Sequence, residues 1–286
     1  MNRHPAIGFI GFGEAGSHIA IGLRSAGLDR LFAYDIRNVR EQAASSGTTV
    51  VDTPSALAES SDILIAAVTA SSALDAATQI APFLGAHHLY TDINSVSPAL
   101  KQEIDAVIQK TNASFVEAAV MAPVPPYGHR VPMLLGGSGA TRFVSTMTPF
   151  GMRLEVLSGK IGTAAAVKMC RSIVVKGLEA LLFECVLGAS RYDAEDRVFA
   201  SLEESFPGLD WKKLANYMIG RSVVHGERRA HEMEEVAETL RAIGIDPIMA
   251  EATARRQAWS AGLDLKSKFS AEGPASYRDV LDVINK

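Results

Sequence analysis

The sequence predicts an α/β protein in which a doubly wound, mostly parallel sheet is followed by an all-helical C-terminal domain. Three observations predict this fold. Short apolar runs alternate with helical patterns over the first 160 residues, a glycine-rich turn directly follows the first run, and no convincing strand follows Gly162. Runs separated by helical segments are typical of βαβ units, and uniformly apolar runs fit strands covered on both faces. The predicted strands are residues 6–10, 31–34, 63–68, 89–90, 115–120, 133–135 and 154–157.

A long helix is predicted over residues 164–190, and at 1.5 Å per residue it would span roughly 40 Å. Because its sequence is apolar all round, we expect it to be buried between two bodies and to join them. The boundary is therefore placed at Gly162, between a domain of residues 1–162 and a helical domain of residues 163–286. Glycine and proline predict breaks between the later helices at residues 207–208, 220, 244–247 and 273–274.

The composition is that of an ordinary soluble protein, with 48% hydrophobic and 21% charged residues. A net charge of −4 gives no electrostatic reason to expect nucleic acid or an anionic membrane as partner. Charged side chains interrupt the long helix, so we expect no membrane span, and the N-terminus has no signal-peptide pattern. We interpret Cys170 and Cys185 as reduced core thiols, because no metal-ligand spacing accompanies them. The sequence thus predicts a cytoplasmic protein.

The strongest motif is a glycine-rich turn between the first apolar run and a helical pattern. Gly11 permits the tight turn, Gly13 lets a diphosphate approach the backbone, and Gly16 lets the helix pack closely on the strand. The helix N-terminus would face the diphosphate with free N–H groups and the positive end of its dipole. The sequence therefore predicts a Rossmann-type dinucleotide site. Its motif residues are Gly11, Phe12, Gly13, Glu14, Ala15 and Gly16.

Residues after the next two runs complete the expected cofactor site. Asp35 ends the second run 19 residues beyond the last motif glycine, where an acid accepts from the ribose hydroxyls of the adenosine half. This acid favours NAD, because it would repel the 2′-phosphate of NADP. Arg37 and Arg40 follow, and either could neutralise that phosphate, so NADP stays possible. Val68 and Thr69, at the end of the third run, are expected to line the same cleft.

A polar turn follows the run at residues 89–90, at the edge of the sheet where ligands bind. We assign Asn94 and Ser95 in this turn to substrate contact. Ser97 precedes Pro98, and this pair is typical of an N-cap and the first helical residue. Ser97 is therefore expected to cap the next helix.

Lys168 lies near the start of the long helix among Ala, Val and Met. Burial lowers the pKa of a lysine toward neutrality, so its amine can act as a general acid or base. Arg171 and Ser172, three and four residues on, share its helix face, and a fixed arginine suits a carboxylate or phosphate. The alternative is a lysine that reaches the surface, with Arg171 in a structural ion pair.

These residues are similar to those of the β-hydroxyacid dehydrogenases, which include 3-hydroxyisobutyrate, tartronate semialdehyde and 6-phosphogluconate dehydrogenases. AIGFIGFGEAG resembles the family's glycine loop, and DINSVSP resembles its substrate loop. Lys168 falls where the family has its catalytic lysine, and Ser172 stands in place of the usual asparagine. The resemblance implies hydride transfer at a carbinol carbon, with Lys168 as the general acid and base.

The chain departs from the family's Pro-Val-Ser-Gly-Gly turn, since residues 119–123 lack the serine and both glycines. Met121 in this segment implies a differently shaped and partly apolar substrate pocket. The helical half resembles a bacterial subgroup whose C-terminal domain is uncharacterised. In the family, a lysine from a comparable C-terminal helix approaches the nicotinamide side of the cleft. The resemblance therefore implies that Arg228 or Arg229 plays this part here, and we assign the substrate contact to Arg229. The alternative is a solvated helix face with an Arg228–Glu232 ion pair.

The leading hypothesis is an NAD(P)-dependent oxidoreductase that transfers a hydride between nicotinamide and the carbinol carbon of a β-hydroxyacid or related polar alcohol. One alternative is an imine reductase of the same superfamily, and another is a dinucleotide-binding sensor without turnover. An apolar helical domain buries more surface when two copies pack together, so we expect a homodimer. No metal site is predicted, because His225 and His231 have no partner at metal-ligand spacing.

Overall fold

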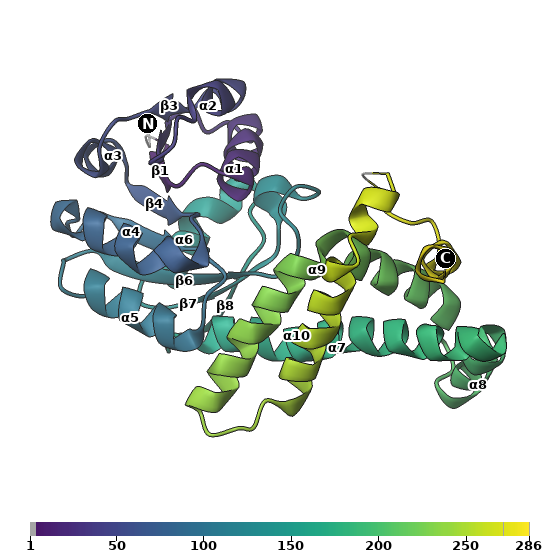
Figure 1. Cartoon of the computed structure of the whole chain (residues 1–286). Helices are drawn as coiled ribbons and strands as arrows, with labels where there is room; N and C mark the ends of the chain where they lie inside the picture. The colour runs from purple at the N-terminus through teal and green to yellow at the C-terminus, as the bar shows by residue number, and fades with distance from the viewer. Residues whose placement is uncertain (1–3, 271, 286) are drawn as a thin grey trace. The chain divides into compact units, whose positions relative to one another are not determined.

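The computed structural model describes residues 4–270 and 272–285, and it has the predicted α/β architecture (Figure 1). The chain forms two compact units, of which the first ends at Lys168 and the second begins at Met169. One eight-stranded sheet forms the centre of the first unit, and the second unit is helical. The domain limits 1–162 and 163–286 stay a prediction.

The strands of the sheet are β1 (Ile7–Ile10), β2 (Leu31–Tyr34), β3 (Thr49–Val50), β4 (Ile63–Ala66), β5 (Leu89–Asp92), β6 (Ser114–Val120), β7 (Met133–Gly136) and β8 (Leu154–Ser158). Their order is β3-β2-β1-β4-β5-β6-β7-β8, and neighbours pair in parallel except β6 and β7. All seven predicted runs are strands, with ends correct to within two residues. Strand β3 was not predicted, because two residues are too few to form a recognisable apolar run.

Six helices cover both faces of this sheet, as its buried strands require. They are α1 (Glu14–Ser25), α2 (Arg40–Ser46), α3 (Pro54–Ser60), α4 (Ala73–Ile80), α5 (Pro98–Ile108) and α6 (Ala140–Met147). One core joins α1, α2 and α6 to the sheet through side chains such as Leu23 and Phe143. The other core joins α3, α4 and α5 through side chains such as Leu57 and Ile104. Figure 1 shows α4 and α5 side by side on one face.

The chain turns back across the sheet between β1 and β4, so that β2 and β4 lie on opposite sides of β1. The connections that follow β1 and β4 therefore leave in opposite directions. In doubly wound sheets this arrangement opens a crevice at the carboxyl ends of the strands, and ligands bind there. The fold thus places the glycine-rich turn after β1 at the edge where a dinucleotide is expected.

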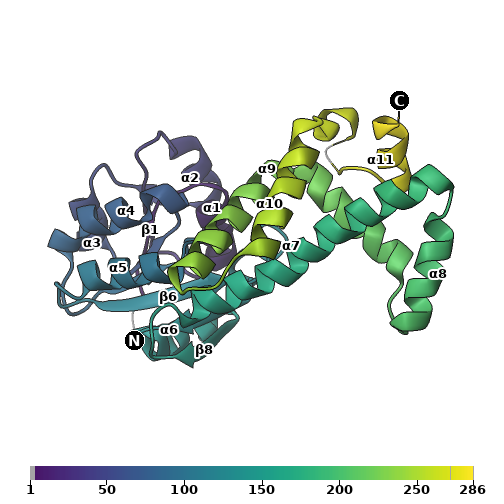
Figure 2. The same cartoon turned by 60° about the horizontal axis from the view of Figure 1, so that its bottom comes forward.

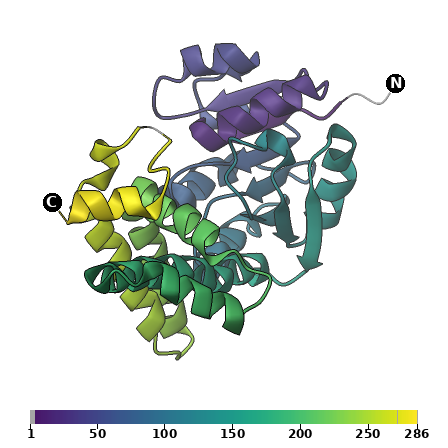
Figure 3. The ribbon, with the colours of Figure 1, turned by 90° about the vertical axis from the view of Figure 1, so that its right-hand side faces the viewer.

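The second unit is built from the later part of α7 (Thr163–Ala189) and from α8 (Glu195–Ser205), α9 (Trp211–Ala242), α10 (Ile248–Gly262) and α11 (Tyr277–Ile284). Figure 2 shows α9 and α10 side by side. In Figure 3 α11 is the yellow helix at the C-terminus, and its Val280 is buried in one core with Phe183 and Ile219. Among the described residues, no helix is long and apolar enough to cross a membrane.

Three of the predicted helix breaks, at residues 207–208, 244–247 and 273–274, fall between helices. The predicted break at Gly220 is wrong, because α9 continues through it. A single glycine inside a helix costs only about 1 kcal/mol, which the packing of a long helix offsets. The irregularity in α9 lies instead at His225, whose φ of −126° and ψ of 15° are not helical.

The expectation that the apolar sequence of α7 makes it a buried helix is also wrong. Val174 and Leu181 are 71% and 57% exposed, and Cys170 is exposed as well. Cys170 is therefore not a core thiol, and Cys185 is half-buried. The helix turns Phe183 toward the core of its own unit, while Cys170, Val174 and Leu181 share a face that this core does not cover.

Candidate functional site

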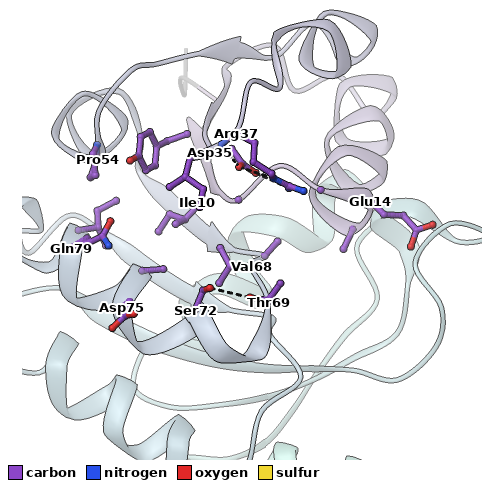
Figure 4. A pocket seen from close by; sticks show the side chains of 18 residues that line it. Ile10, Glu14, Asp35, Arg37, Pro54, Val68, Thr69, Ser72, Asp75 and Gln79 are labelled. Atoms are coloured by element: carbon purple, nitrogen blue, oxygen red, sulfur yellow. Dashed lines mark hydrogen bonds and ion pairs between the residues drawn. The ribbon is translucent and has the colours of Figure 1, made fainter. Parts of the chain in front are cut away.

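A cavity of about 680 Å³ lies at the carboxyl ends of β1, β2 and β4 (Figure 4). This volume is within the range of about 300–1,000 Å³ that is typical of cofactor sites. Helix α4 and the residues after the three strands form its walls. The cavity brings together most of the predicted cofactor residues, namely Gly11, Gly13, Glu14, Ala15, Asp35, Arg37, Val68 and Thr69.

The glycine turn has the geometry that its sequence predicts. Gly11 has a φ of +81°, and a Cβ there would lie 2.6 Å from the backbone oxygen of Ala67, so glycine is required. A Cβ at Gly16 would lie 3.0 Å from the oxygen of Gly11. A Cβ at Gly13 would meet nothing closer than Arg37 at 3.7 Å, so a side chain there would fill the cavity rather than clash. The turn is thus shaped for close approach of a ligand.

Helix α1 begins at Glu14 without a side-chain cap, so its first N–H groups have no partner within the helix. Together with the helix dipole they favour an anion at this end of the cavity. The turn and the start of α1 therefore fit the diphosphate of a dinucleotide.

The Asp35 carboxylate accepts hydrogen bonds from four donors. Oδ2 accepts from the Phe12 N–H at 2.8 Å and from Nη2 of Arg37 at 3.1 Å. Oδ1 accepts from the backbone N–H of Arg37 at 2.9 Å and from its Nε at 3.2 Å. Burial alone would raise the pKa of Asp35. The hydrogen bonds from Arg37 and Phe12 lower it by more than burial raises it, so the pKa of Asp35 lies below its ordinary value. Asp35 is therefore charged at neutral pH.

Arg37 covers Asp35 from the solvent side (Figure 4). Its side chain is 68% exposed, while that of Asp35 is 3% exposed, and the hydrogen bond to Asp35 raises the pKa of Arg37. Arg40 instead bonds to Asp52 at 2.7 Å and does not line the cavity. Of the two candidate arginines, Arg37 is therefore the one next to the position expected for the adenosine ribose.

Other residues that line the cavity were not predicted, and they include Tyr34, Ser72, Asp75 and Gln79. Ser72 bonds to Thr69 at 3.0 Å, as drawn in Figure 4. Asp75 and Gln79 are four residues apart and share one face of α4. That spacing, in the segment that follows the predicted strand at residues 63–68, was the available signal.

Asn94 lies in the turn after β5 and is 5% exposed. Its Oδ1 accepts from the Val68 N–H at 2.8 Å, and its own N–H bonds to Oδ1 of Asp92 at 2.7 Å. Its Nδ2 is buried and has no partner among the described residues. Asn94 is thus held beside Val68, which lines the cavity, and its side-chain NH2 group is not bonded to any described residue.

The remaining candidates of the first unit have different positions. The Phe12 ring is fully buried in the core, so only its backbone serves the site. Ser95 is exposed, and Met121 is half-buried with its N–H bonded to Pro132. Ser97 caps α5 as predicted, because its Oγ accepts from the Leu100 N–H at 3.1 Å. Lys168, the last residue of this unit, is half-buried on α7.

Arg171 and Ser172 follow on α7 in the second unit. Arg171 is exposed, and the Ser172 hydroxyl accepts from Nζ of Lys176 at 3.0 Å. Lys176 also pairs with Glu232 at 2.9 Å. Arg228 pairs with the same Glu232 at 3.1 Å, as in the ion pair that the sequence analysis left open.

Arg229 is buried and pairs with the fully buried Glu179 at 2.7 Å. Burial lowers the pKa of Arg229 and raises the pKa of Glu179, because both charges lose their hydration. Nε of Arg229 has no partner among the described residues. Burial and the neighbouring arginines lower the pKa of His225, which is therefore neutral at neutral pH. The positive charge of Arg229 is thus largely neutralised by Glu179, a residue of the same unit.

The residues that the structure describes contain no group of His, Cys, Asp and Glu side chains that could hold a metal ion.

Two family models match the chain. Residues 6–137 match the NAD binding domain of 6-phosphogluconate dehydrogenase, and residues 189–260 match a domain of unknown function, DUF1932.

Two solved structures are similar over nearly the whole chain. A conserved hypothetical protein from Sinorhizobium meliloti is 36% identical, with a TM-score of 0.85, and the match covers 99% of this chain and 96% of that one. Conserved protein MTH1747 of unknown function, described as structurally similar to 3-hydroxyacid dehydrogenases, is 31% identical. Its TM-score is 0.78, and the match covers 90% of this chain and 97% of that one.

More distant relatives include proteins of named activity. The mitochondrial 3-hydroxyisobutyrate dehydrogenase of Drosophila melanogaster is 26% identical over 211 residues, which are 72% of this chain and 64% of that enzyme. An imine reductase from Myxococcus stipitatus, solved with NADP+, is 18% identical with a TM-score of 0.55. That match covers 90% of this chain and 95% of that one, and it shows the fold alone.

Proposed function

The chain belongs to the β-hydroxyacid dehydrogenase superfamily, and from this premise we propose that it is an NAD(P)-dependent oxidoreductase. The proposed substrate is a β-hydroxyacid or a related polar alcohol, oxidised or formed at its carbinol carbon. The observation that supports this best is the cavity, where the glycine turn, the uncapped α1 and Asp35 meet. When bound, the nicotinamide accepts or supplies the hydride.

NAD is the proposed cofactor. The charged Asp35 follows β2, where a carboxylate accepts from ribose hydroxyls and repels a 2′-phosphate. Before a ribose hydroxyl can bind, the Arg37 side chain has to release its hydrogen bond to at least one carboxylate oxygen of Asp35. The Arg37 side chain is exposed, so it has room to move. NADP stays the alternative cofactor, because the same guanidinium is the group that would bind a 2′-phosphate.

Lys168 is the proposed general acid and base. In oxidation its neutral amine takes the proton of the substrate hydroxyl, and in reduction its ammonium returns the proton. The proposed substrate contacts are Asn94 and Ser95 after β5, Met121 after β6, and Arg171, Ser172 and Arg229 in the helical unit. Arg229 is expected to contribute through Nε, because Glu179 occupies its Nη1.

We propose that the protein is a cytoplasmic homodimer. Cys170, Val174 and Leu181 form an exposed face of α7 in the second unit, and a second copy of the chain would cover it. The unpaired thiols fit a reducing compartment. Val174→Lys is expected to give a monomer in light scattering, and Tyr192→Lys, at a residue 84% exposed elsewhere in the unit, to leave the mass unchanged. A Val174→Lys protein of unchanged mass would exclude this face as the interface.

The activity is tested by following reduced nicotinamide in absorbance over a panel of hydroxyacids and other carbinols, with NAD and with NADP. Wild type and Lys168→Ala are compared, and cofactor binding is measured for both. Turnover by wild type that Lys168→Ala loses, with cofactor still bound, supports the proposal. Turnover of cyclic imines in place of carbinols would favour an imine reductase. Tight cofactor binding without turnover of any substrate class would favour a sensor.

A further inference from the structure

Lys101 is a buried lysine that does not line the cofactor cavity. It lies on α5 and is 1% exposed. Its Nζ donates to the backbone oxygen of Asp92 at 2.8 Å and lies 3.2 Å from Oδ1 of the same residue, whose side chain is fully buried. Burial removes the hydration of both charges, and the attraction between them offsets this loss of free energy only in part. A buried ion pair is therefore weak evidence for a stabilising role. Its position next to the turn after β5 points to another role.

The ion pair holds the turn that contains Asn94. Oδ1 of Asp92, next to Lys101, also accepts the Asn94 N–H at 2.7 Å. The Asn94 side chain is then oriented by Val68, whose N–H bonds to Oδ1 at 2.8 Å. Because a backbone N–H can only donate, the amide oxygen must face Val68 and Nδ2 must point away from it. Buried donors are nearly always satisfied, and this Nδ2 has no partner among the described residues.

The strand order indicates which part of a dinucleotide reaches Asn94. Asp35 follows β2, the glycine turn follows β1, Val68 lies beyond β4, and Asn94 lies beyond β5, so these segments succeed one another along the sheet. The adenosine ribose belongs at Asp35 and the diphosphate at the start of α1. The nicotinamide half therefore extends past β4 toward β5.

We propose that Lys101 and Asp92 are positioning residues, which preset the Asn94 amide as a donor to an oxygen of the nicotinamide half of the dinucleotide. The ion pair of Lys101 and Asp92 holds the turn, and Oδ1 of Asp92 holds the Asn94 backbone through its N–H. The Val68 N–H binds Oδ1 of Asn94, so that Nδ2 is the atom left to face the ligand. Neither charged residue touches the ligand. Since Nδ2 carries two hydrogens, the amide can donate to the nicotinamide half and also to a substrate bound beside it. This inference rests on the proposed function, because it requires a nicotinamide cofactor.

Binding of NADH and of ADP-ribose to the full chain tests the proposal, because ADP-ribose lacks the nicotinamide. Titration calorimetry compares wild type, Lys101→Met and Asn94→Ala. We expect both variants to raise the Kd of NADH about tenfold, as for one lost hydrogen bond, and to keep the Kd of ADP-ribose within about twofold. The matched control is Lys110→Met, at an exposed lysine just beyond α5, and it should change neither Kd.

The double variant tests whether Lys101 acts through Asn94. Adding Lys101→Met to Asn94→Ala should cause no further loss of NADH binding. A second loss of similar size would overturn the proposal, as would equal weakening of both ligands or no change in either. Should Lys101→Met fail to fold, Asp92→Asn removes the ion pair at almost constant shape, and the same pattern is expected. A wild-type protein that binds neither ligand would instead refute the proposed function, and this inference with it.

Discussion

Glu117 and Gly162 are joined by a hydrogen bond of 2.7 Å, from the Gly162 N–H to Oε2 of the carboxylate. The other oxygen, Oε1, accepts from the Ala165 N–H, also at 2.7 Å. Glu117 lies on β6 and is fully buried, so a strand of the sheet caps the first turn of α7. Its negative charge lies at the positive end of the helix dipole. This contact holds the start of the helix on which Lys168 lies.

Glu117→Gln should therefore destabilise the protein. Glutamine keeps one acceptor oxygen and turns an N–H₂ group toward a backbone N–H, which leaves buried donors without acceptors. We expect a loss of about 1–3 kcal/mol in the free energy of unfolding, measured in urea. Glu103→Gln, at an exposed residue of α5, is the control and should change it by less than about 0.5 kcal/mol. Equal stability of the two variants would show that Glu117 is not an effective cap.

Arg37→Ala should increase the preference for NAD. Without the guanidinium, Asp35 is uncompensated and repels a 2′-phosphate more strongly. We expect the Kd of NADPH to rise about tenfold while that of NADH changes less than about threefold. Arg40→Ala, which removes the Asp52 partner outside the cavity, should affect neither cofactor. Equal weakening of NADH and NADPH would contradict a role of Arg37 in cofactor choice.

The lowered pKa of Asp35 predicts a pH-dependent contribution to stability. The folded state binds this proton less tightly than the unfolded state, so the stabilisation is present above the ordinary pKa of 3.8 and is lost as the pH falls through the lowered value. The Tm gap between wild type and Asp35→Asn should stay constant from about pH 7 to about pH 5 and narrow below about pH 4. A constant Tm gap across this pH range would argue against the lowered pKa of Asp35.

Two glycines of α9 should respond in opposite directions to alanine. A Cβ at Gly226 would lie 3.0 Å from the Gln257 oxygen and 3.3 Å from the Ala261 nitrogen, both backbone atoms of α10. Gly226→Ala should therefore cost about 1–3 kcal/mol in unfolding free energy. At Gly220 a Cβ would meet only Pro274, at 3.8 Å, and Gly220→Ala should add about 0.5–1 kcal/mol through helix propensity. Denaturation of both variants measures this, and a shift of the same sign in both would refute the packing argument.

The strands and the glycine turn could be predicted because their signals are local. The run at residues 31–34 and Asp35 directly after it predict both β2 and a carboxylate that lines the cavity, within five positions of the chain. The turn at Gly11 requires a conformation that only glycine readily adopts, and this too is a property of a few neighbouring residues.

Lys101 and Glu117 could not be recognised in this way. Lys101 resembles any lysine of an amphipathic helix, and Glu117 interrupts an otherwise apolar strand. Their roles depend on partners that lie 9 and 45 residues away. The exposed face of α7 could not be predicted for the same reason, because the sequence of an apolar helix face does not show whether another segment covers that face.

Arg229 illustrates which properties follow from the sequence alone and which depend on the tertiary structure. The sequence by itself determined the sheet, the helical second half and the dinucleotide turn, because periodicity and backbone conformation are set by near neighbours. It also placed Arg229 on a helix. Only the tertiary structure decided that Glu179, 50 residues earlier, pairs with Nη1 of Arg229, and that Nε of Arg229 and Nδ2 of Asn94 have no partner among the described residues. Which polar groups remain free for a ligand depends on contacts between distant segments, and these form only when the chain folds.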